Sequence, residues 1–438
     1  MGRKNRPNEA TRKKAAEESS PTAAPLQGGQ GDDRRDDAMA FLLRLGRALH
    51  AYGSPAHRLE AALDRAARRL GYHGQFFSNP TSLFISLAGD GRTRTEMARM
   101  DPGQVHLEKL GLLEDVLSGL DDGSLSPAEA DRRVTGVLEA PPRYGAVATT
   151  LAFAFASGSA ARFFTGAWRE MAMATVVGLV IGLLAVLAGR IPRLGRLFEP
   201  ASALAAAALA TAGAILAPAW GWGDLSPYVA TVAGLIVLIP GLTLTVAMTE
   251  LATQHLISGS ARLAGALVTF LTIAFGVALG QRAVEVFLGP APDVVPAVLP
   301  GWTELAALGV TAVALAVLFR GHPRDIPWIF IAALVALQGT RLGSELLGPQ
   351  LGAFLGAVMV GAGSNLYGRL LGRPTAVTSL PGLMLLVPGS LGFRSLSLLI
   401  AKDVITGIEA AFQVTLVAVA LVTGLLIANV LVPPRRVL

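Results

Sequence analysis

The sequence predicts an α-helical polytopic membrane protein preceded by a small cytoplasmic α+β domain, and three observations support this fold class. The chain of 438 residues is 52% hydrophobic and only 16% charged, with a mean hydropathy of +0.52, and soluble domains are seldom so apolar. Most ionisable side chains lie in residues 1–143, and the remainder consists of apolar runs long enough to cross a bilayer. We therefore expect the α+β domain at 38–143 and two membrane modules at 144–285 and 300–438.

Composition excludes several classes of site and partner. The chain has no cysteine, which excludes disulfides and thiolate metal sites. The net charge of +6 could indicate nucleic-acid binding, but the basic residues of the apolar part lie singly at the ends of apolar runs, as in cytoplasmic loops of membrane proteins. We expect no nucleic acid, cofactor or metal. Residues 1–37 are charged, rich in Pro, Ser and Gly, and lack an apolar signal-peptide core, so they predict a disordered tail.

The segment 38–143 shows helix and strand patterns in turn. Residues 38–53 have apolar residues at helical spacing, and a second helix is expected to begin with Ser54 as its N-cap and to end at Gly71. Alternating residues on both sides of Asp90-Gly91 predict strands around a hairpin, and two more helices follow. The histidines lack an HExxH motif or a cysteine pair, which favours ordinary polar side chains over a metal site: His50, His57, His73 and His106.

The apolar part contains ten segments of about the ~20 residues needed to cross a bilayer. They lie at 145–164, 170–189, 200–219, 227–249, 260–280, 302–319, 326–341, 345–367, 375–393 and 409–432. The loops after the even-numbered spans and the C-terminal tail carry more Arg and Lys than the other loops. This bias favours an orientation with the N-terminus in the cytoplasm.

Two of the apolar runs share the pattern G-L-x-x-L-x-P-G, beginning at Gly234 (GLIVLIPGLT) and Gly382 (GLMLLVPGSL). Proline removes a backbone donor and glycine permits a bend, so each run should interrupt its helix. In a membrane, freed backbone groups are tolerated only where they face protein or a water-filled cavity. A simple proline kink would explain one break, whereas two breaks at matched positions favour a transport pathway that both spans line. Because five spans separate them, they predict two five-helix inverted repeats, which are common in secondary transporters.

Polar residues near these breaks are the candidate site. Half-helix amide termini would hold a substrate carboxylate, and hydroxyls would recognise a side-chain hydroxyl. The candidate substrate-binding residues are Pro240, Gly241, Thr243, Thr245, Asn365, Pro388, Gly389 and Ser390.

Charged groups in or near a bilayer are usually functional. Glu250 is the strongest candidate for a titrating, proton-coupling carboxylate, while His255 and Asp403 occupy matched positions of the two repeats. The alternative is that these are span-end charges in headgroup water. For Glu250 the two explanations are equally good, and for His255 and Asp403 the second is the better one.

Three stretches resemble the threonine/serine exporter family. FLLRLGRALHAYGSPAHRLEAAL, with the later NPTSLFISL, resembles the family's cytoplasmic start. IPGLTLTVAMTELATQHLISGSARL is similar to its first membrane module, and LPGLMLLVPGSLGFRSLSLLIAKDVITGIEAA is similar to its second. The resemblance covers about residues 38–433, and the order and spacing of the three stretches carry it rather than any one motif.

The resemblance implies a multi-pass carrier of the bacterial inner membrane that exports threonine and serine, with protons as the coupling ion in an antiport mechanism. By motif position, the family's acidic residue falls on Glu250, where relatives carry Asp, and the second Pro-Gly-Ser falls on Pro388, Gly389 and Ser390. The implied partners are a small-molecule substrate, protons and the lipid bilayer, with a homo-oligomer left open. Split relatives are associated with dicarboxylates such as succinate, so that substrate is an alternative.

Two other functional classes fit less well. GWGD at 221–224 matches the GxGD of intramembrane aspartyl proteases, but a second aspartate in an apolar helix and a Pro-Ala-Leu segment are both missing. The chain is therefore not expected to be an enzyme. A channel or a signalling membrane protein stays as an alternative, and the lack of a Walker A pattern argues against ATP as the energy source.

Overall fold

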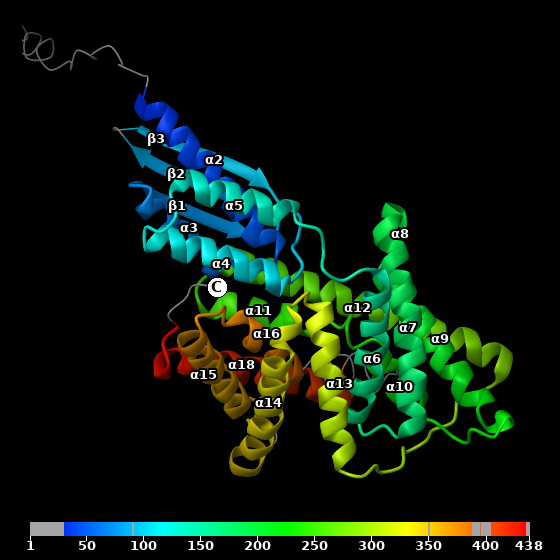
Figure 1. The fold of residues 1–438 in the computed structure, drawn as a ribbon. Coiled ribbons are helices and arrows are strands. Elements are labelled where there is room, and N and C mark those ends of the chain that lie inside the picture. The colour runs from blue at the N-terminus through cyan, green and yellow to red at the C-terminus, as the bar shows by residue number, and fades with distance from the viewer. Residues whose placement is uncertain (1–29, 90–91, 349–350, 388–394, 396–403, 435–438) are drawn as a thin grey trace, which may run out of the picture.

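The computed structural model describes residues 30–89, 92–348, 351–387, 395 and 404–434. The described chain is mostly helical and contains one three-stranded sheet close to its N-terminus (Figure 1). We call residues 30–139, which include this sheet, the N-terminal region, and the helices from Ala146 onward the membrane part. The N-terminal region lies over one end of the membrane helices (Figure 1).

The N-terminal region consists of four helices and three strands. The helices are α2 (Gln30–Ala51), α3 (Ala56–Arg69), α4 (Leu107–Asp121) and α5 (Pro127–Glu139). The antiparallel strands are β1 (His73–Asn79), β2 (Ser82–Gly89) and β3 (Arg92–Arg99), in the order β1-β2-β3. β2 and β3 pair as far as Gly89 and Arg92, which flank the turn expected at Asp90-Gly91.

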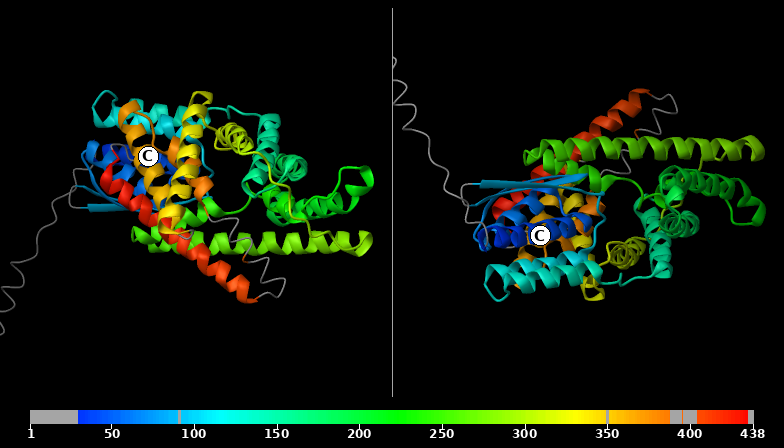
Figure 2. Two further views of the ribbon diagram at one scale, coloured as in Figure 1. Left: turned by 90° about the horizontal axis from the view of Figure 1, so that it is seen from below. Right: turned by 90° about the horizontal axis from the view of Figure 1, so that it is seen from above.

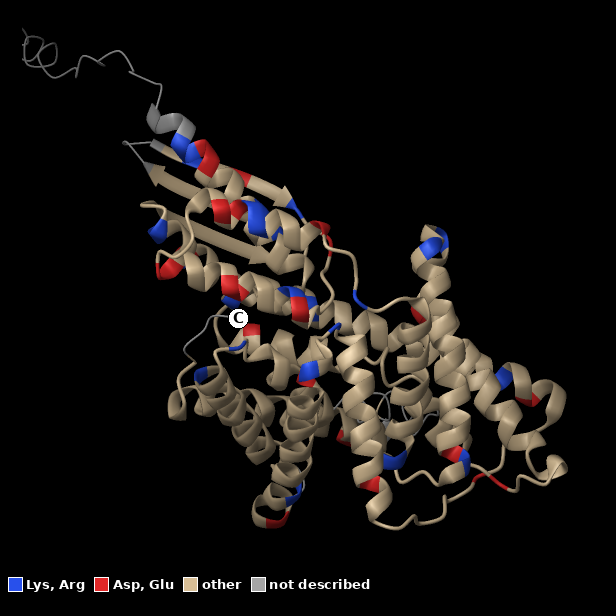
Figure 3. Ribbon diagram, viewed as in Figure 1, with Lys and Arg blue, Asp and Glu red and all other residues tan. Residues whose placement is uncertain are grey.

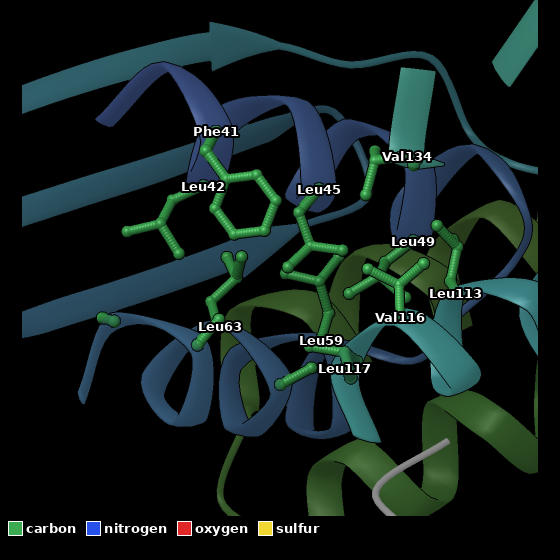
Figure 4. Close-up of a cluster of buried hydrophobic side chains, with 14 of the residues drawn as sticks. Phe41, Leu42, Leu45, Leu49, Leu59, Leu63, Leu113, Val116, Leu117 and Val134 are labelled. Carbon is green, nitrogen blue, oxygen red and sulfur yellow. The ribbon is translucent and has the colours of Figure 1, made fainter. Parts of the chain in front are cut away.

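One face of the sheet and the inner faces of the helices share a hydrophobic core. Leu83, Ile85 and Leu87 of β2 are fully buried and alternate with more exposed residues, as on a strand with one packed face. Leucines of α2 and α3 pack together between the sheet and α4 (Figure 4). Burial of this apolar surface holds α3, and therefore its first turn, in a fixed place.

Helix α2 corrects the predicted extent of the disordered tail. It begins at Gln30, inside the segment 1–37 that composition assigned to disorder. Asp36 of this turn pairs with Arg94 on β3, and Arg35 is buried. Such contacts with a distant strand stabilise the start of α2, and local composition does not reveal them.

The membrane part contains helices at all ten predicted apolar segments. They are α6 (Ala146–Phe163), α7 (Trp168–Arg190), α9 (Phe198–Leu216), α10 (Pro227–Gly234), α11 (Gly241–Ala252), α12 (Leu256–Leu288), α13 (Trp302–Leu318), α14 (Ile326–Leu347), α15 (Gly352–Leu371), α16 (Ala376–Leu386) and α18 (Val404–Leu431). Short helices α8 (Pro192–Gly195), η1 (Pro218–Trp220) and η2 (Pro323–Asp325) join some of them. Among the described residues, five helices are long and apolar enough to cross a membrane. The chain is thus polytopic, while the number of ten spans stays a prediction.

The surface of these helices suits a lipid environment. Leu183 on α7, Phe275 on α12 and Ile408 on α18 are 56%, 66% and 59% exposed, and continuous apolar surface of this kind is unusual in soluble proteins. Charged residues gather in the N-terminal region and near the helix ends (Figure 3). The 33-residue α12 runs across the molecule and packs along α9 (Figure 2).

Small residues allow close packing of α7 against α6 at Gly178 and Gly182, which have the spacing G-x-x-x-G. A Cβ atom on Gly178 would lie 2.6 Å from the carbonyl oxygen of Phe153, and one on Gly182 would lie 2.9 Å from the backbone of Thr150. Both glycines of this G-x-x-x-G pair therefore bring α7 against α6. Small residues at this spacing let two helices approach closely.

The fourth predicted span is interrupted at the expected place. α10 ends at Gly234 and α11 begins at Gly241, with a non-helical segment ending at Pro240 between them. Pro240 itself has φ −78° and ψ 43°, outside the helical range. In the ninth span, α16 ends at Leu386 and Val387 is extended. The second Pro-Gly pair follows directly and lies outside the described residues.

The described parts of the fourth and ninth predicted spans run in opposite directions. The last turn of α11 reaches the N-terminal region, where the backbone N–H of Ala56 donates to Glu250 Oε1 at 2.9 Å. α16, in contrast, begins at the N-terminal region, where Arg58 Nη1 donates to Thr375 Oγ1 at 3.4 Å. One broken span thus approaches the first turn of α3, and the other departs from it.

Candidate functional site

The first turn of α3 lies where the N-terminal region meets the membrane part. α3 begins at Ala56, after Pro55 in an extended conformation, and no local side chain caps it. Glu250 accepts the hydrogen bond from the Ala56 N–H instead. The prediction of Ser54 as N-cap is therefore wrong. A carboxylate is a strong acceptor for the partial positive charge of a helix N-terminus, so Glu250 from a distant helix takes the place of the local hydroxyl.

Glu250 is fully buried and has three donors. Besides Ala56 N–H, Ser258 Oγ donates to its Oε2 at 2.7 Å, and Arg262 Nε approaches both carboxylate oxygens at 3.1 and 3.2 Å. Charge-assisted hydrogen bonds of this kind compensate for the cost of burying a carboxylate. Glu250 therefore joins α11 to the start of α12 and to α3.

His255 forms a second link between the two parts of the chain. Its Nε2 lies 3.2 Å from Glu60 Oε2, and its Nδ1 lies 2.9 Å from the carbonyl oxygen of Thr253. The Thr253 hydroxyl oxygen also lies 3.3 Å from Nδ1, so either ring nitrogen can carry the hydrogen, and a hydrogen bond between Nε2 and Glu60 Oε2 needs a proton on one of these two atoms. Burial raises the pKa of Glu60, against the opposing effects of the Ser78 N–H and of His255. The His255–Glu60 contact is therefore a hydrogen bond with one proton, which either His255 or Glu60 carries.

A polar cavity of about 160 Å³ lies beside the first turn of α3. α11 contributes Thr245 and Thr249, α15 contributes Asn365, α16 contributes Ser379 and α18 contributes Asn429. Its volume is close to that of engineered cavities of about 150 Å³ that hold benzene. The cavity thus has hydroxyl and amide groups on several sides and room for a small polar molecule.

The structure brings together some of the predicted site residues and separates others. Thr245 and Asn365 line the polar cavity, whereas Thr243 is exposed and does not line it. Glu250 and His255 lie next to it, in the contact with α3. Pro240 and Gly241 form the break itself. Pro388, Gly389, Ser390 and Asp403 lie outside the described residues, so their assignments stay predictions.

Sequence reasoning missed the residues that α3 contributes. His57 and Arg58 line the polar cavity, and the His57 ring centroid lies 5.9 Å from that of His255. Burial, together with the positive charges of Arg58, His255 and Arg262, lowers the pKa of His57 to about 3. His57 is therefore neutral near pH 7. The available signal was the run of polar side chains directly after Ser54-Pro55 within a stretch that carries the family resemblance.

A second, mainly apolar cavity of about 450 Å³ lies on the other side of the first break. Ile236 and Val237, just before Pro240, line this apolar cavity, whereas Leu242 and Thr245, just after it, line the polar one. α16 is divided in the same way, because Ser379 lines the polar cavity and Val387 the apolar one. Both spans thus pass from one cavity to the other.

The apolar cavity reaches toward the end of the helices that is far from the N-terminal region. Its lining includes the ion pair between Glu304 and Arg341. Glu304 lies in the first turn of α13, whereas the far end of α13 contacts the N-terminal region through the hydrogen bond from Leu107 N–H to Phe319 O. The fifteen residue steps from Glu304 to Phe319 correspond to about 22 Å along the helix. Leu318 and Phe319 line the apolar cavity as well, so it extends along α13 from the far end to the end that contacts the N-terminal region.

Comparison with models of protein families shows the family to which the chain belongs. A family model described as a threonine/serine exporter matches residues 40–283, which is more than half of the chain. The chain belongs to the threonine/serine exporter family. A second model of the same description matches residues 304–431, and the unmatched stretch between them includes the loop between α12 and α13. The prediction of a fused form with both modules of this exporter family is confirmed, and the family is one of transporters rather than enzymes.

Several curated relatives of this chain are fungal membrane proteins. Pheromone-regulated membrane protein 10 of Candida albicans is 26% identical over 409 residues, covering 86% of this chain and 34% of the relative. The protein of the same name from Saccharomyces cerevisiae is 25% identical over 365 residues, covering 81% of this chain and 46% of the relative. The chain thus spans a third to a half of their length. They fit a multi-pass membrane protein but not the expected bacterial inner membrane. No solved structure matches the chain.

Proposed function

We propose that this chain is a secondary active transporter that exports small amino acids such as threonine and serine. The observation that carries the proposal is the position of the two oppositely directed spans, α10–α11 and α16, between a polar and an apolar cavity. Interrupted helices of opposite direction are the usual way in which secondary transporters build a substrate site away from lipid. Membership of the exporter family supports the same reading.

In the proposed mechanism, the substrate enters the polar cavity from the side of the N-terminal region, which we assign to the cytoplasm. Loop charges favour this orientation in a cell membrane. The two inverted repeats would then rock about the breaks, so that the polar cavity closes and the apolar cavity opens a path to the far side. Hydroxyl groups such as Thr245 would recognise the side-chain hydroxyl, and Asn365 would bind a second polar group.

Proton coupling is assigned to the contact between α3 and the membrane part. The shared proton of His255 and Glu60 lies at this contact, and Glu250 attaches α11 to the same turn of α3. A proton that enters from outside would charge this pair and weaken its hold on α11, so that α11 can move relative to α3 while the modules rock. Asp403 is the corresponding candidate in the second module.

Counterflow in proteoliposomes tests the proposed function. Vesicles loaded with unlabelled threonine should accumulate labelled threonine, and excess serine should compete, because one saturable site exchanges both. Vesicles without protein serve as the control. Competition by succinate in place of serine would support dicarboxylate export instead. Uptake that neither saturates nor responds to internal threonine would indicate a channel and contradict the proposal.

A further inference from the structure

Arg58 projects a positive charge into the polar cavity without a carboxylate to balance it. It lies in the first turn of α3 and lines the cavity, and its one hydrogen bond is the 3.4 Å contact to Thr375 Oγ1. Across the described ranges, no carboxylate lies within ion-pair distance of Arg58. Burial lowers its pKa, opposed by the charge of Glu114. Because a guanidinium has five N–H donors and stays charged in proteins, this one has free capacity for a planar anion.

Other polar atoms of the same cavity also lack partners. Within the part of the chain that the structure describes, Ser54 Oγ, His57 Nδ1 and Ser364 Oγ are buried and make no hydrogen bond. All three residues line the polar cavity, and the residues Ser54 and Ser364 are each only 3% exposed. A buried polar group without a partner costs about 1–3 kcal/mol. A ligand with several polar groups could form hydrogen bonds with all three atoms at once.

The charges of the cavity restrict the ligand. Arg58 is the one charged side chain among the described lining residues when His57 is neutral, so a single negative charge matches it best. A dicarboxylate would bring a second negative charge with no cation to receive it. A neutral His57 can accept a hydrogen bond from an ammonium group, which a protonated imidazole would repel.

We propose that Arg58 binds the carboxylate of the transported amino acid, so that the N-terminal region supplies part of the substrate site. This inference rests on the proposed function and names the group that receives the substrate. Two parallel N–H···O bonds would hold the carboxylate in the fork of the guanidinium. Ser54, Ser364 and His57 would then bind the remaining polar groups. The N-terminal region would thus act as one wall of the site, and movement of the membrane helices away from Arg58 would release the carboxylate.

The test compares Arg58→Gln and Arg58→Lys with the matched control Arg68→Gln. Arg68 lies on the same helix, but its side chain is 68% exposed and pairs with Asp64. The purified full-length variants are compared in proteoliposomes by the concentration of threonine, and of threoninol, that half-inhibits counterflow of labelled threonine. Threoninol lacks the carboxylate. Elution as a single species in size exclusion shows that each variant is folded.

In the wild type, threonine should compete at least ten times better than threoninol. Arg58→Gln should raise the half-inhibiting concentration of threonine about 10- to 100-fold and abolish the preference over threoninol, because the charge-assisted bonds are lost. Arg58→Lys should give a half-inhibiting concentration of threonine between those of the wild type and Arg58→Gln, because lysine keeps the positive charge but cannot form the two parallel hydrogen bonds of a guanidinium. Arg68→Gln should match the wild type. An unchanged preference in folded Arg58→Gln would overturn this inference alone, whereas no threonine counterflow in the wild type would overturn the proposed function.

Discussion

At the scale of single residues, one helical turn of the N-terminal region collects the polar contacts to the membrane part. Ala56 donates to Glu250, Arg58 reaches Thr375 and Glu60 shares a proton with His255. Glu250 was predicted as a titrating carboxylate, and its environment explains why it is buried: a guanidinium and two further donors surround it. The residue that shares a proton in this structure is Glu60, which the sequence did not single out.

Substitution separates the proposed roles of Glu60 and Glu250. Glu60→Gln should abolish the dependence of threonine efflux on a pH gradient while counterflow continues, because Gln cannot hold the shared proton. Glu250→Gln should lose pH-driven efflux and also unfold more easily, by about 3 kcal/mol, because Arg262 is left without a charged partner. Efflux from vesicles and thermal unfolding are the measurements. Glu129→Gln on α5, where the Glu129 side chain is 39% exposed, is the control. Undiminished pH-driven efflux in Glu250→Gln would remove Glu250 from the coupling role.

At the scale of elements, the break between α10 and α11 is the central feature. A continuous helix through Pro240 would carry the residues before and after it along one line. The break instead divides them between two cavities. Turn hydrogen bonds pair several backbone groups of this segment, such as those from the Leu238 and Ile239 N–H groups to Leu235 O. The segment is also enclosed by protein, because Leu235 and Ile239 are buried.

Restoring helical propensity at this break should impair transport. Pro240→Ala returns a backbone donor and favours continuation of α11 toward α10. We expect the rate of counterflow to fall at least ten-fold without loss of thermal stability. Pro227→Ala is the matched control, because Pro227 occupies the first turn of α10, where proline is well tolerated. Wild-type counterflow in Pro240→Ala would show that the break is not needed.

At the scale of the whole molecule, the N-terminal region lies against one end of the membrane part and touches both modules. It contacts the first module through Glu250 and His255, and the second through Thr375 and the end of α13. Relative movement of the modules must therefore move or break these contacts. The fusion of both modules in one chain keeps the N-terminal region bound at their junction.

Cysteine labelling tests the proposed orientation, because the chain has no cysteine of its own. Val298 lies between α12 and α13 and is 97% exposed, and Arg132 is exposed on α5. In intact cells, a membrane-impermeant maleimide should label Val298→Cys at once and Arg132→Cys only after permeabilisation. The cysteine-free wild type is the control. The reverse pattern would place the N-terminal region outside.

The sequence alone determined the properties that arise from local chemistry. Apolar runs of membrane length predicted the helices of the membrane part, and Pro240-Gly241 predicted the break between α10 and α11. The order of three stretches predicted the family. Each of these depends on residues that are neighbours along the chain or along one helix, so the amino-acid order is sufficient.

Only the tertiary structure decided which residues meet at the site. Glu250 caps α3 although 194 residues separate it from Ala56, and Arg58 faces Thr375 across 317 residues. The same packing directs Thr245 into the polar cavity and leaves Thr243 exposed, although both lie in the first turn and a half of α11. Such pairings depend on how separate helices pack in space, and no local pattern in the sequence records which faces come together.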